Sequence, residues 1–370
     1  MMEAVGSDLK AILVNDSGNE KKWRDHVPIY SLINKPKDIR YLSHIFKLLG
    51  FALKKDCPPK NRVIRKIIKK HAITHILCQY GTFAVQFMDV WRITDSAIFV
   101  HFHGFDQTFD LRGYDPPGKN RFNEDYKKEI ISLSHRAIFI VNSIFSKNML
   151  INAGIHPNRI ILKYFGTPLP SNQKKHKNID KVKIIHLGRL VDCKSPDRTI
   201  KAFEIAKEMG LQGTLWIVGD GPLRVFCELL RQRSKFKEDI HIFGAVSWLE
   251  AQQILSTADI FTQHNIKGEI TQQSEAFGVS ILEAMSYGLP IVGTRSGGVT
   301  ETVIDGETGI LVEPGDTIGQ ADALIKLANQ PELRQKMGDA GRERIVNYFS
   351  VERETIQLRE ILRISDTRSK

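Results

Sequence analysis

The stretch from Ser274 to Thr294, SEAFGVSILEAMSYGLPIVGT, constrains the fold of this chain most. It begins with polar residues, continues with apolar residues at helical spacing, breaks at a Gly-Leu-Pro sequence and ends in an apolar run. This order predicts a loop, a short helix, a turn and a buried strand. Gly278, directly before the helix, allows the backbone to approach a ligand closely.

The start of this helix also predicts a binding site. The N–H groups of residues 277–280 are expected to be free and, with the positive end of the helix dipole, to bind an anion. Glu275 and Glu283 flank this position, although like charges repel. Ionised carboxylates accept hydrogen bonds from sugar hydroxyls, which gives them a reason to lie there. Two solvated glutamates on an ordinary helix are the alternative.

The pair of glutamates eight residues apart, the glycine before the helix and the trailing GLPIVGT resemble one family. It is the retaining glycosyltransferases of the GT-B fold, glycosyl transferases group 1 (family 4), which include bacterial mannosyltransferases and sucrose synthases. The resemblance implies that Glu283 holds the ribose of the donor. It implies that Glu275 lies beside the transferred sugar.

Length and composition fit a globular protein with two cores. The chain has 370 residues, 42% of them hydrophobic, and no apolar run approaches the ~18–20 residues that a membrane span needs. The N-terminus shows no basic region followed by a cleavage-like site, so no signal peptide is predicted. The four cysteines are far apart and form no CxxC pair, which favours a cytoplasmic location and neither disulfides nor zinc.

The charge of the chain is uneven. Residues 1–165 carry 26 Lys and Arg against 15 Asp and Glu, whereas residues 166–370 carry 27 against 27. Residues 54–71 alone hold eight Lys and Arg and one Asp, and after Pro59 their apolar residues share one helical face. We expect either peripheral contact with an anionic membrane on its inner face or a domain helix with a solvated basic face. No nucleic-acid-binding signature is present.

The first half alternates predicted strands with predicted helices, which indicates a parallel, doubly wound sheet. The expected strands are residues 9–14, 74–78, 97–101, 137–141 and 160–163, and the expected helices are residues 38–49, 59–71, 82–93 and 146–153. The family usually opens with a strand, a glycine-rich loop and a helix. Residues 1–50 contain no such unit, which predicts a chain that is truncated or starts at an internal codon.

A polar turn follows the strand at residues 97–101, at the edge where ligands of such sheets bind. His103, Gly104 and Asp106 match the HGxD turn of the resembled family. The resemblance implies that His103 faces the transferred sugar. A histidine that only satisfies the end of a strand is the alternative.

The second half opens with a strand at residues 183–187, followed by Gly188, Arg189 and, five residues later, Lys194 before a helix at 196–209. A planar guanidinium and a point charge between a strand and a helix suit a phosphate clamp. They match the GR…K motif of the family, in which both side chains hold the donor diphosphate. Two surface cations near a turn are the alternative. Gly244 falls where the family presents its backbone to the nucleotide base.

The remaining segments of the second half follow the same alternation. Strands are expected at residues 214–218, 240–243 and 260–262, and helices at 248–256, from about 317 to 346 and at 351–363. In GT-B proteins the last helix crosses back onto the first domain. We therefore predict an N-terminal domain at 1–170, a linker at 171–183, a nucleotide-sugar-binding domain at 184–346 and a returning helix at 347–370.

The resemblance implies a complete reaction. A hexosyl group passes from a UDP- or GDP-sugar to a glycan or lipid-linked acceptor in cell-surface polysaccharide biosynthesis, without a metal or organic cofactor, and the sequence has no Asp-x-Asp motif. The implied catalytic residues are His103, Glu275, Arg189 and Lys194, and the implied donor-binding residues are Glu283, Phe277, Gly278, Val279, Gly188 and Gly244.

Three other classes remain open. An inactive GT-B relic would bind a sugar nucleotide without turnover. A nicotinamide dehydrogenase also has doubly wound domains, but no G-x-G-x-x-G follows a strand here. A non-enzymatic membrane-binding protein would explain the basic first half but neither the glutamate pair nor the phosphate clamp.

Overall fold

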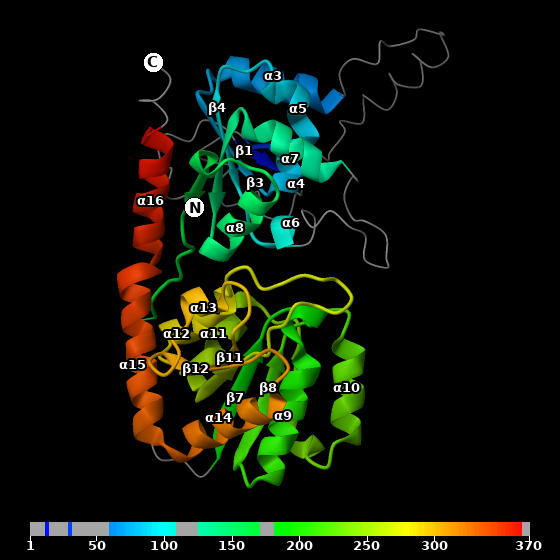
Figure 1. The fold of residues 1–370 in the computed structure, drawn as a ribbon, viewed down its shortest axis with the longest axis vertical. Helices are drawn as coiled ribbons and strands as arrows, with labels where there is room; N and C mark the ends of the chain where they lie inside the picture. Colours follow the sequence, from blue (N-terminus) through cyan, green and yellow to red (C-terminus); the bar gives the residue numbers. More distant parts are fainter. Residues whose placement is uncertain (1–11, 15–28, 32–58, 109–124, 171–180, 365–370) are drawn as a thin grey trace, which may run out of the picture.

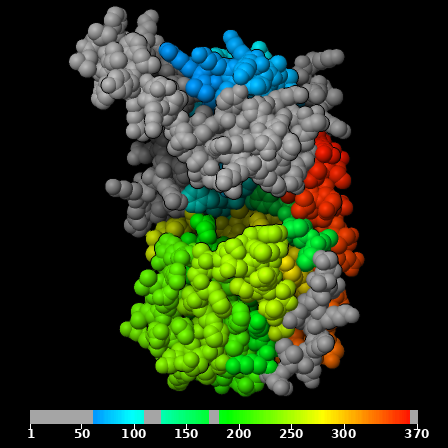
Figure 2. Space-filling view, turned by 180° about the vertical axis from the view of Figure 1, so that it is seen from behind, coloured from blue at the N-terminus to red at the C-terminus, as the bar shows by residue number. Residues whose placement is uncertain are grey.

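The computed structural model describes residues 12–14, 29–31, 59–108, 125–170 and 181–364 (Figure 1). These residues form two α/β halves, each built around a parallel sheet. Helices α15 (Pro331–Tyr348) and α16 (Val351–Ile364) run along one side of both halves. The same helices border the two halves in the reverse view (Figure 2).

The sheet of the first half has the strand order β3-β4-β5-β6, and all its neighbours pair in parallel. Its strands are β3 (His75–Gln79), β4 (Ala97–His101), β5 (Ala137–Val141) and β6 (Ile160–Leu162). Their apolar runs are mostly buried, as parallel strands covered on both faces require. Helices of this half are α3 (Pro59–Lys70), α6 (Phe105–Thr108), α7 (Tyr126–Ser134) and α8 (Ile144–Asn152).

Two short strands, β1 (Ile12–Val14) and β2 (Ile29–Ser31), pair in parallel apart from this sheet. Strand β1 lies within the strand expected at residues 9–14. The helix expected at residues 38–49 lies outside the described residues. The missing opening unit therefore stays a prediction.

The sheet of the second half has the strand order β12-β11-β10-β7-β8-β9, again all parallel. Its strands are β7 (Val182–Leu187), β8 (Gly213–Val218), β9 (Ile240–Gly244), β10 (Ile260–Thr262), β11 (Ile291–Thr294) and β12 (Gly309–Val312). The chain order reverses between β7 and β10. Ligands of open parallel sheets bind outside the carboxyl ends of the strands at such a reversal.

Helices cover both faces of this second sheet, and they pack against it through two buried apolar clusters. One cluster joins the sheet to α11 (Trp248–Thr257), α12 (Val279–Ser286), α13 (Val299–Thr302) and α15. The other joins it to α9 (Pro196–Glu208), α10 (Arg224–Arg233) and α14 (Thr317–Asn329). The linker expected at residues 171–183 is described only from residue 181, and β7 already begins at Val182.

Two expected helices are broken, which corrects the sequence analysis. The helix expected at residues 82–93 is three short segments, α4 (Gly81–Ala84), a 3₁₀ turn (Val85–Phe87) and α5 (Met88–Trp91). Its apolar residues pack into the core of the first half without one continuous helical stripe. The helix expected at 317–346 ends at Asn329, and Pro331 begins α15, because proline lacks the N–H that would continue the helix.

Helix α3 buries its isoleucines inside the first half. Ile64 and Ile67 are buried and Ile68 packs against the same core, whereas Val63 is exposed, contrary to the expected apolar face. The cations Lys66, Lys69 and Lys70 are exposed. The apolar face of this helix is thus part of the domain core, and its basic face remains in contact with solvent.

Helix α16 returns to the first half. Leu358 and Ile361 form one buried cluster with Phe99 of β4 and Ile140 of β5. Glu354 lies nearer the crossing, where its carboxylate is 2.6 Å from the ammonium of the fully buried Lys163. None of the described helices is long and apolar enough to cross a membrane.

Candidate functional site

A pocket of about 390 Å³ lies between the two halves. Its walls on the side of the first half include Tyr80 and the turn that follows β4, and its walls on the other side come from the segments after β7 and β10. The lining residues are Tyr80, His103, Gly104, Phe105, Thr108, Arg189, Cys193, Lys194, Gln273, Ser274, Glu275 and Ala276. All four residues predicted to be catalytic are therefore brought to one pocket. A larger hollow along α15 contains none of them.

Gly188 directly follows β7 and starts the segment that carries the two cations. Its φ is +158°, and a Cβ at this position would come within 3.2 Å of the Lys194 side chain and 3.0 Å of Gln263. The absence of a side chain at Gly188 therefore lets Lys194 lie against the end of the strand. Lys194 closes a single 3₁₀ turn, Asp192–Lys194, directly before α9.

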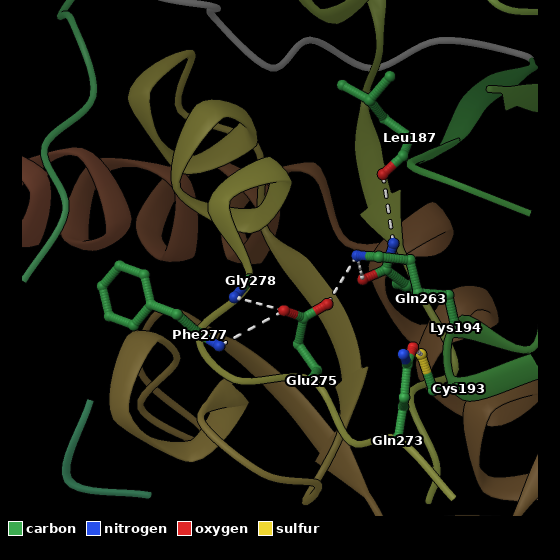
Figure 3. Close-up of polar contacts among 8 residues, drawn as sticks. All are labelled: Leu187, Cys193, Lys194, Gln263, Gln273, Glu275, Phe277 and Gly278. Atoms are coloured by element: carbon green, nitrogen blue, oxygen red, sulfur yellow. Dashed lines mark hydrogen bonds and ion pairs between the residues drawn. The ribbon is translucent and has the colours of Figure 1, made fainter. Parts of the chain in front are cut away.

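The carboxylate of Glu275 lies between Lys194 and the start of α12 (Figure 3). Its Oε2 is 2.7 Å from the Lys194 ammonium, and its Oε1 accepts hydrogen bonds from Gly278 N at 3.0 Å and Phe277 N at 3.4 Å. The side chains of Lys194 and Glu275 are only 14% and 15% exposed. Burial by itself would raise the pKa of Glu275, but Lys194 and the two amides together lower it. Glu275 is therefore held as an anion.

This arrangement corrects one expectation from the sequence. The amides of Phe277 and Gly278 are not free, because Glu275 already accepts their hydrogen bonds. The amides of Val279 and Ser280 have no acceptor among the described residues, as befits the first turn of a helix. In this state a carboxylate of the chain itself occupies part of the anion site.

Glu283 lies on the second turn of α12 and is partly buried. Burial raises the pKa of its carboxyl group, and the charge of Lys194 lowers it by a smaller amount. No described residue donates a hydrogen bond to its carboxylate. A half-buried, unpaired acceptor next to the anion site is suited to a ligand hydroxyl.

Arg189 lines the same pocket and is exposed. Its guanidinium makes no hydrogen bond or ion pair with the described residues. The two cations of the predicted clamp therefore differ, because Lys194 is engaged with Glu275 and Arg189 is available to an anion from solvent.

The turn after β4 is fixed by Asp106. This fully buried carboxylate accepts hydrogen bonds from Gly81 N at 2.7 Å and His103 N at 3.0 Å. Burial raises its pKa to about 6, and the amide hydrogen bonds oppose the shift. Asp106 thus shapes the turn and ties it to the start of α4.

The ring of His103 is held from two sides. Its Nε2 is 2.6 Å from Gln79 Oε1, and its ring stacks on Tyr80 with centroids 4.3 Å apart. Burial, and then the charge of Lys163, lower the pKa of His103 to about 4, so the ring is neutral near pH 7. A neutral His103 that donates from Nε2 to Gln79 keeps Nδ1 as an acceptor.

The two sides of the pocket touch at Gly104. Its φ is +105°, and a Cβ added here would lie 2.7 Å from the Cβ of Ala276. The residue therefore permits both a left-handed turn and a close approach of the first half to the loop that carries Glu275.

Buried histidines predict a loss of stability in mild acid. Burial, reinforced by nearby lysines, lowers the pKa of His101 to about 2 and of His186 to about 3, from an ordinary 6.5. Below pH 6.5 the unfolded chain binds protons on these rings and the folded chain does not. The free energy of unfolding therefore falls as the pH is lowered from 7 to 5. Each ring contributes a loss of ~1.4 kcal/mol for every pH unit below 6.5.

Asp106 offsets part of this loss, because its raised pKa favours proton uptake by the folded state. The lowered pKa of His103 adds a similar loss to those of His101 and His186, so we expect a net loss on the order of 4 kcal/mol between pH 7 and pH 5, measured by urea denaturation at both values. Equal or higher stability at pH 5 would mean that the folded protein protonates these rings.

Gly244 ends β9 with φ +71°, and a Cβ there would come within 2.9 Å of the Arg224 guanidinium. Arg224 is oriented by Asp220 and Glu228, at 2.9 and 3.0 Å. Gly244 is not among the residues that line the pocket. The structure thus places it at the edge of the sheet, beside an ordered cation.

Some residues of the site were missed in the sequence analysis. Gln263, at the end of β10, receives a 3.4 Å contact from Lys194 Nζ through Oε1 and donates to Leu187 O through Nε2 at 3.2 Å. Gln263 follows β10, next to β7, where the strand order reverses. Knowledge of the strand order would therefore have identified Gln263 as a site residue. Gln79, the last residue of β3, and Tyr80, which follows it, are the partners of His103.

A metal site is not evident. The described residues contain no group of three or more His, Cys, Asp or Glu side chains that could hold a metal ion. The cationic side chains in the pocket are Arg189 and Lys194.

Known proteins share both the sequence and the fold. Residues 170–344 match the family described as Glycosyl transferases group 1. The N-acetyl-alpha-D-glucosaminyl L-malate synthase of Bacillus anthracis is 31% identical over 293 residues, which are 76% of this chain and 70% of that protein. This chain belongs to the group 1 glycosyltransferases. The membership decides for a glycosyltransferase against a dehydrogenase or a non-enzymatic membrane-binding protein.

Other relatives of this glycosyltransferase are matched over shorter lengths. The capsular polysaccharide biosynthesis glycosyltransferase CapM of Staphylococcus aureus is 28% identical over 184 residues, 48% of this chain and 45% of that protein. The chain thus covers less than half the length of CapM.

Solved structures establish the GT-B fold of the glycosyltransferase. The Anabaena protein Alr3699/HepE, crystallised with UDP, has a TM-score of 0.75 at 18% identity, over 97% of this chain and 93% of that one. The sucrose-phosphate synthase of Thermosynechococcus elongatus has a TM-score of 0.71 at 18% identity, over 99% and 98%. The predicted fold class, two Rossmann-like domains facing each other, is confirmed.

Proposed function

We propose that this glycosyltransferase moves a hexosyl group from a UDP- or GDP-sugar to a hydroxyl of a glycan or lipid-linked acceptor, with retention of the anomeric configuration. The observation that carries the proposal is the meeting of Arg189, Lys194 and Glu275 with His103 in one pocket, with Glu275 also bound to the amide before α12. Cell-surface polysaccharide biosynthesis is the process that we assign to it.

The charges of the pocket suit a diphosphate leaving group. Negative charge grows on the diphosphate oxygens as the glycosidic bond breaks, and preorganised cations and amides stabilise that charge in the transition state. Arg189, Lys194 and the amides of Val279 and Ser280 supply these groups. The departing phosphate takes the proton of the acceptor hydroxyl, so no side chain has to act as nucleophile.

The remaining residues orient the donor. Glu283 accepts hydrogen bonds from the ribose, and the backbone near Gly244 contacts the base. Glu275 and His103 face the transferred sugar from opposite sides of the pocket, and the neutral ring of His103 offers Nδ1 as an acceptor. Donor binding then requires Glu275 to release at least one of the contacts that it makes in the structure.

The relatives support a nucleotide-sugar donor. Structures of Alr3699/HepE are titled as complexes with UDP, with UDP and glucose, and with UDP-glucose. A Corynebacterium glutamicum relative, 30% identical over 201 residues, is named as dependent on GDP-mannose. Either nucleotide is therefore compatible with the family.

A screen of donors tests the proposal. The purified chain is incubated with a panel of UDP- and GDP-sugars, and nucleotide release and thermal shift are measured together. Release of one nucleoside diphosphate supports transfer, and NMR of the product reports the anomeric configuration. Binding of a donor without any release of nucleotide would favour the inactive relic. If no donor is bound and no nucleotide is released, the proposal is wrong.

Chelation is expected to leave the activity unchanged. The pocket offers the two cations Arg189 and Lys194 to the diphosphate, and the sequence lacks the acidic pair that bridges a diphosphate to a divalent ion. The rate is measured with the donor found in the screen, with and without EDTA. Loss of activity that magnesium or manganese restores would contradict the proposal.

Membrane contact is proposed through the basic face of α3, with the protein peripheral on the inner face of the membrane. The isoleucines of this helix are buried, so the contact is electrostatic, at ~1 kcal/mol for each basic residue near an anionic surface. Co-sedimentation with liposomes is expected to require anionic lipid and to weaken with salt. If neutral and anionic vesicles recover the same amount of protein, the basic face of α3 is only solvated and does not bind a membrane.

A further inference from the structure

The carboxylate of Glu301 forms one of the contacts between the two halves of the enzyme. Glu301, in the short helix α13 of the second half, accepts hydrogen bonds from Ile144 N at 2.7 Å and Phe145 N at 2.8 Å. These amides begin α8 of the first half, 157 and 156 residues away in sequence. The first amides of a helix have no intrahelical acceptor, so an anion is favoured there by both hydrogen bonding and the helix dipole.

Glu301 is itself rigidly held on its own side. The guanidinium of Arg344 donates to the carbonyls of Glu301 and Thr302, at 2.7 and 3.0 Å, and lies 5.2 Å from the ring centres of Tyr348 and Phe349. The position of α13 is therefore fixed against α15, and the carboxylate is presented from a rigid support.

The glycines before α13 connect it to Glu275. Gly298 N donates to Glu275 O at 2.9 Å, and a Cβ on Gly298 would lie 2.0 Å from Ala276 O. Two backbones that pack this closely move together. Any shift of Glu301 is thus passed to the loop that carries Glu275.

The start of α8 is connected in turn to His103. The side chain of Gln107, in α6, contacts Ser146 Oγ in the first turn of α8. Helix α6 directly follows the turn at residues 103–104, which Asp106 fixes by accepting from His103 N. The carboxylate of Glu301 therefore lies on a continuous chain of contacts from His103 to Glu275.

We propose that Glu301 is a positioning residue of the transfer reaction, which sets the distance between the His103 side and the Glu275 side of the pocket. The inference rests on the proposed function. The proposed diphosphate and nucleoside contacts, Arg189, Lys194, α12 and Glu283, all belong to the second half. Loss of the Glu301 contact then impairs the alignment of the transferred sugar and leaves nucleotide binding intact.

Glu301→Gln tests this directly. The amide keeps one acceptor oxygen and places an NH₂ group against the other backbone N–H. We expect kcat with the donor from the screen to fall at least ten-fold, while the Kd for UDP or GDP, by calorimetry, stays within two-fold. Glu343→Gln, an exposed glutamate of α15, is the matched control and is expected to change neither. A parallel loss of kcat and nucleotide affinity would indicate a general structural defect and overturn the proposal.

Ile144→Pro removes one donor from the other side of the same contact. Ile144 is the first residue of α8, where proline is well tolerated, and the preceding Ser143 has the extended backbone that proline requires. We expect the same loss of kcat, and a double variant with Glu301→Gln that is no worse than the poorer single variant. Additive losses would mean that the two residues act separately.

Hydrogen exchange separates this inference from the proposed function. With UDP or GDP present, the amides of Ile144 and Phe145 are expected to exchange at least ten-fold faster in Glu301→Gln than in the wild type and in Glu343→Gln. This readout needs no substrate, so it holds even if the donor screen finds no turnover. Equal exchange in all three proteins would overturn the inference.

Discussion

Lys194→Ala is expected to lose about 2–4 kcal/mol of transition-state stabilisation, the scale of other preorganised charge sites. Lys194 ends the turn that precedes α9, beside the end of β7, where it can meet a diphosphate at the reversal of strand order. Its removal also leaves the largely buried Glu275 without its cation. The free energy of unfolding is therefore expected to fall together with kcat/KM.

Arg189→Ala separates these two effects. Arg189 is exposed and has no partner among the described residues, so we expect a similar loss in kcat/KM with little change in stability, within about 0.5 kcal/mol. Lys201→Ala, which removes an exposed lysine of α9, is the matched control for charge. Unchanged kinetics in a folded Lys194 or Arg189 variant would remove that residue from the site.

The two glutamates are expected to respond differently to the same change. Glu283→Gln should weaken binding of both the free nucleoside diphosphate and the nucleotide sugar, because its carboxylate is proposed to accept from the ribose. Loss of one hydrogen bond to a charged group costs about 1.5–3 kcal/mol, which calorimetry resolves.

Glu275→Gln should mainly reduce turnover. In the structure Glu275 occupies part of the anion site through Lys194 and two amides of α12. Removal of its charge therefore leaves nucleoside diphosphate binding equal or tighter, while the contact with the transferred sugar is lost. If Glu275→Gln weakens the nucleoside diphosphate as much as Glu283→Gln does, the separate roles are wrong.

Most of the fold could be predicted from the sequence because its signals are local. The strands at residues 97–101, 137–141 and 260–262 are found with the bounds that their apolar runs predict. Such runs are long enough only for buried parallel strands, and the segments between them are spaced for crossover helices. The break at Pro331 was missed in the sequence analysis, although proline cannot continue a helix.

The candidate site was predictable for a different reason. Gly188, Arg189 and Lys194 follow one strand, and His103 follows another, so the rule that ligands bind beyond the carboxyl ends of parallel strands brings them together. Gln263 was missed because the sequence does not reveal that β10 is the neighbour of β7. The amides of Phe277 and Gly278 were expected to be free, but Glu275 accepts their hydrogen bonds. This was missed because the contacts of Glu275 depend on its side-chain rotamer.

The sequence by itself determined the alternation of strands and helices, the group of residues at the ends of the strands, and the family. These properties depend on residues close together in the chain, where periodicity, turn chemistry and spacing act. Only the tertiary structure decided that α3 buries its isoleucines, that Glu275 pairs with Lys194, and that Glu301 reaches the start of α8. Each of these contacts joins segments whose distance is set by the packing of whole sheets and domains, and no local pattern encodes that distance.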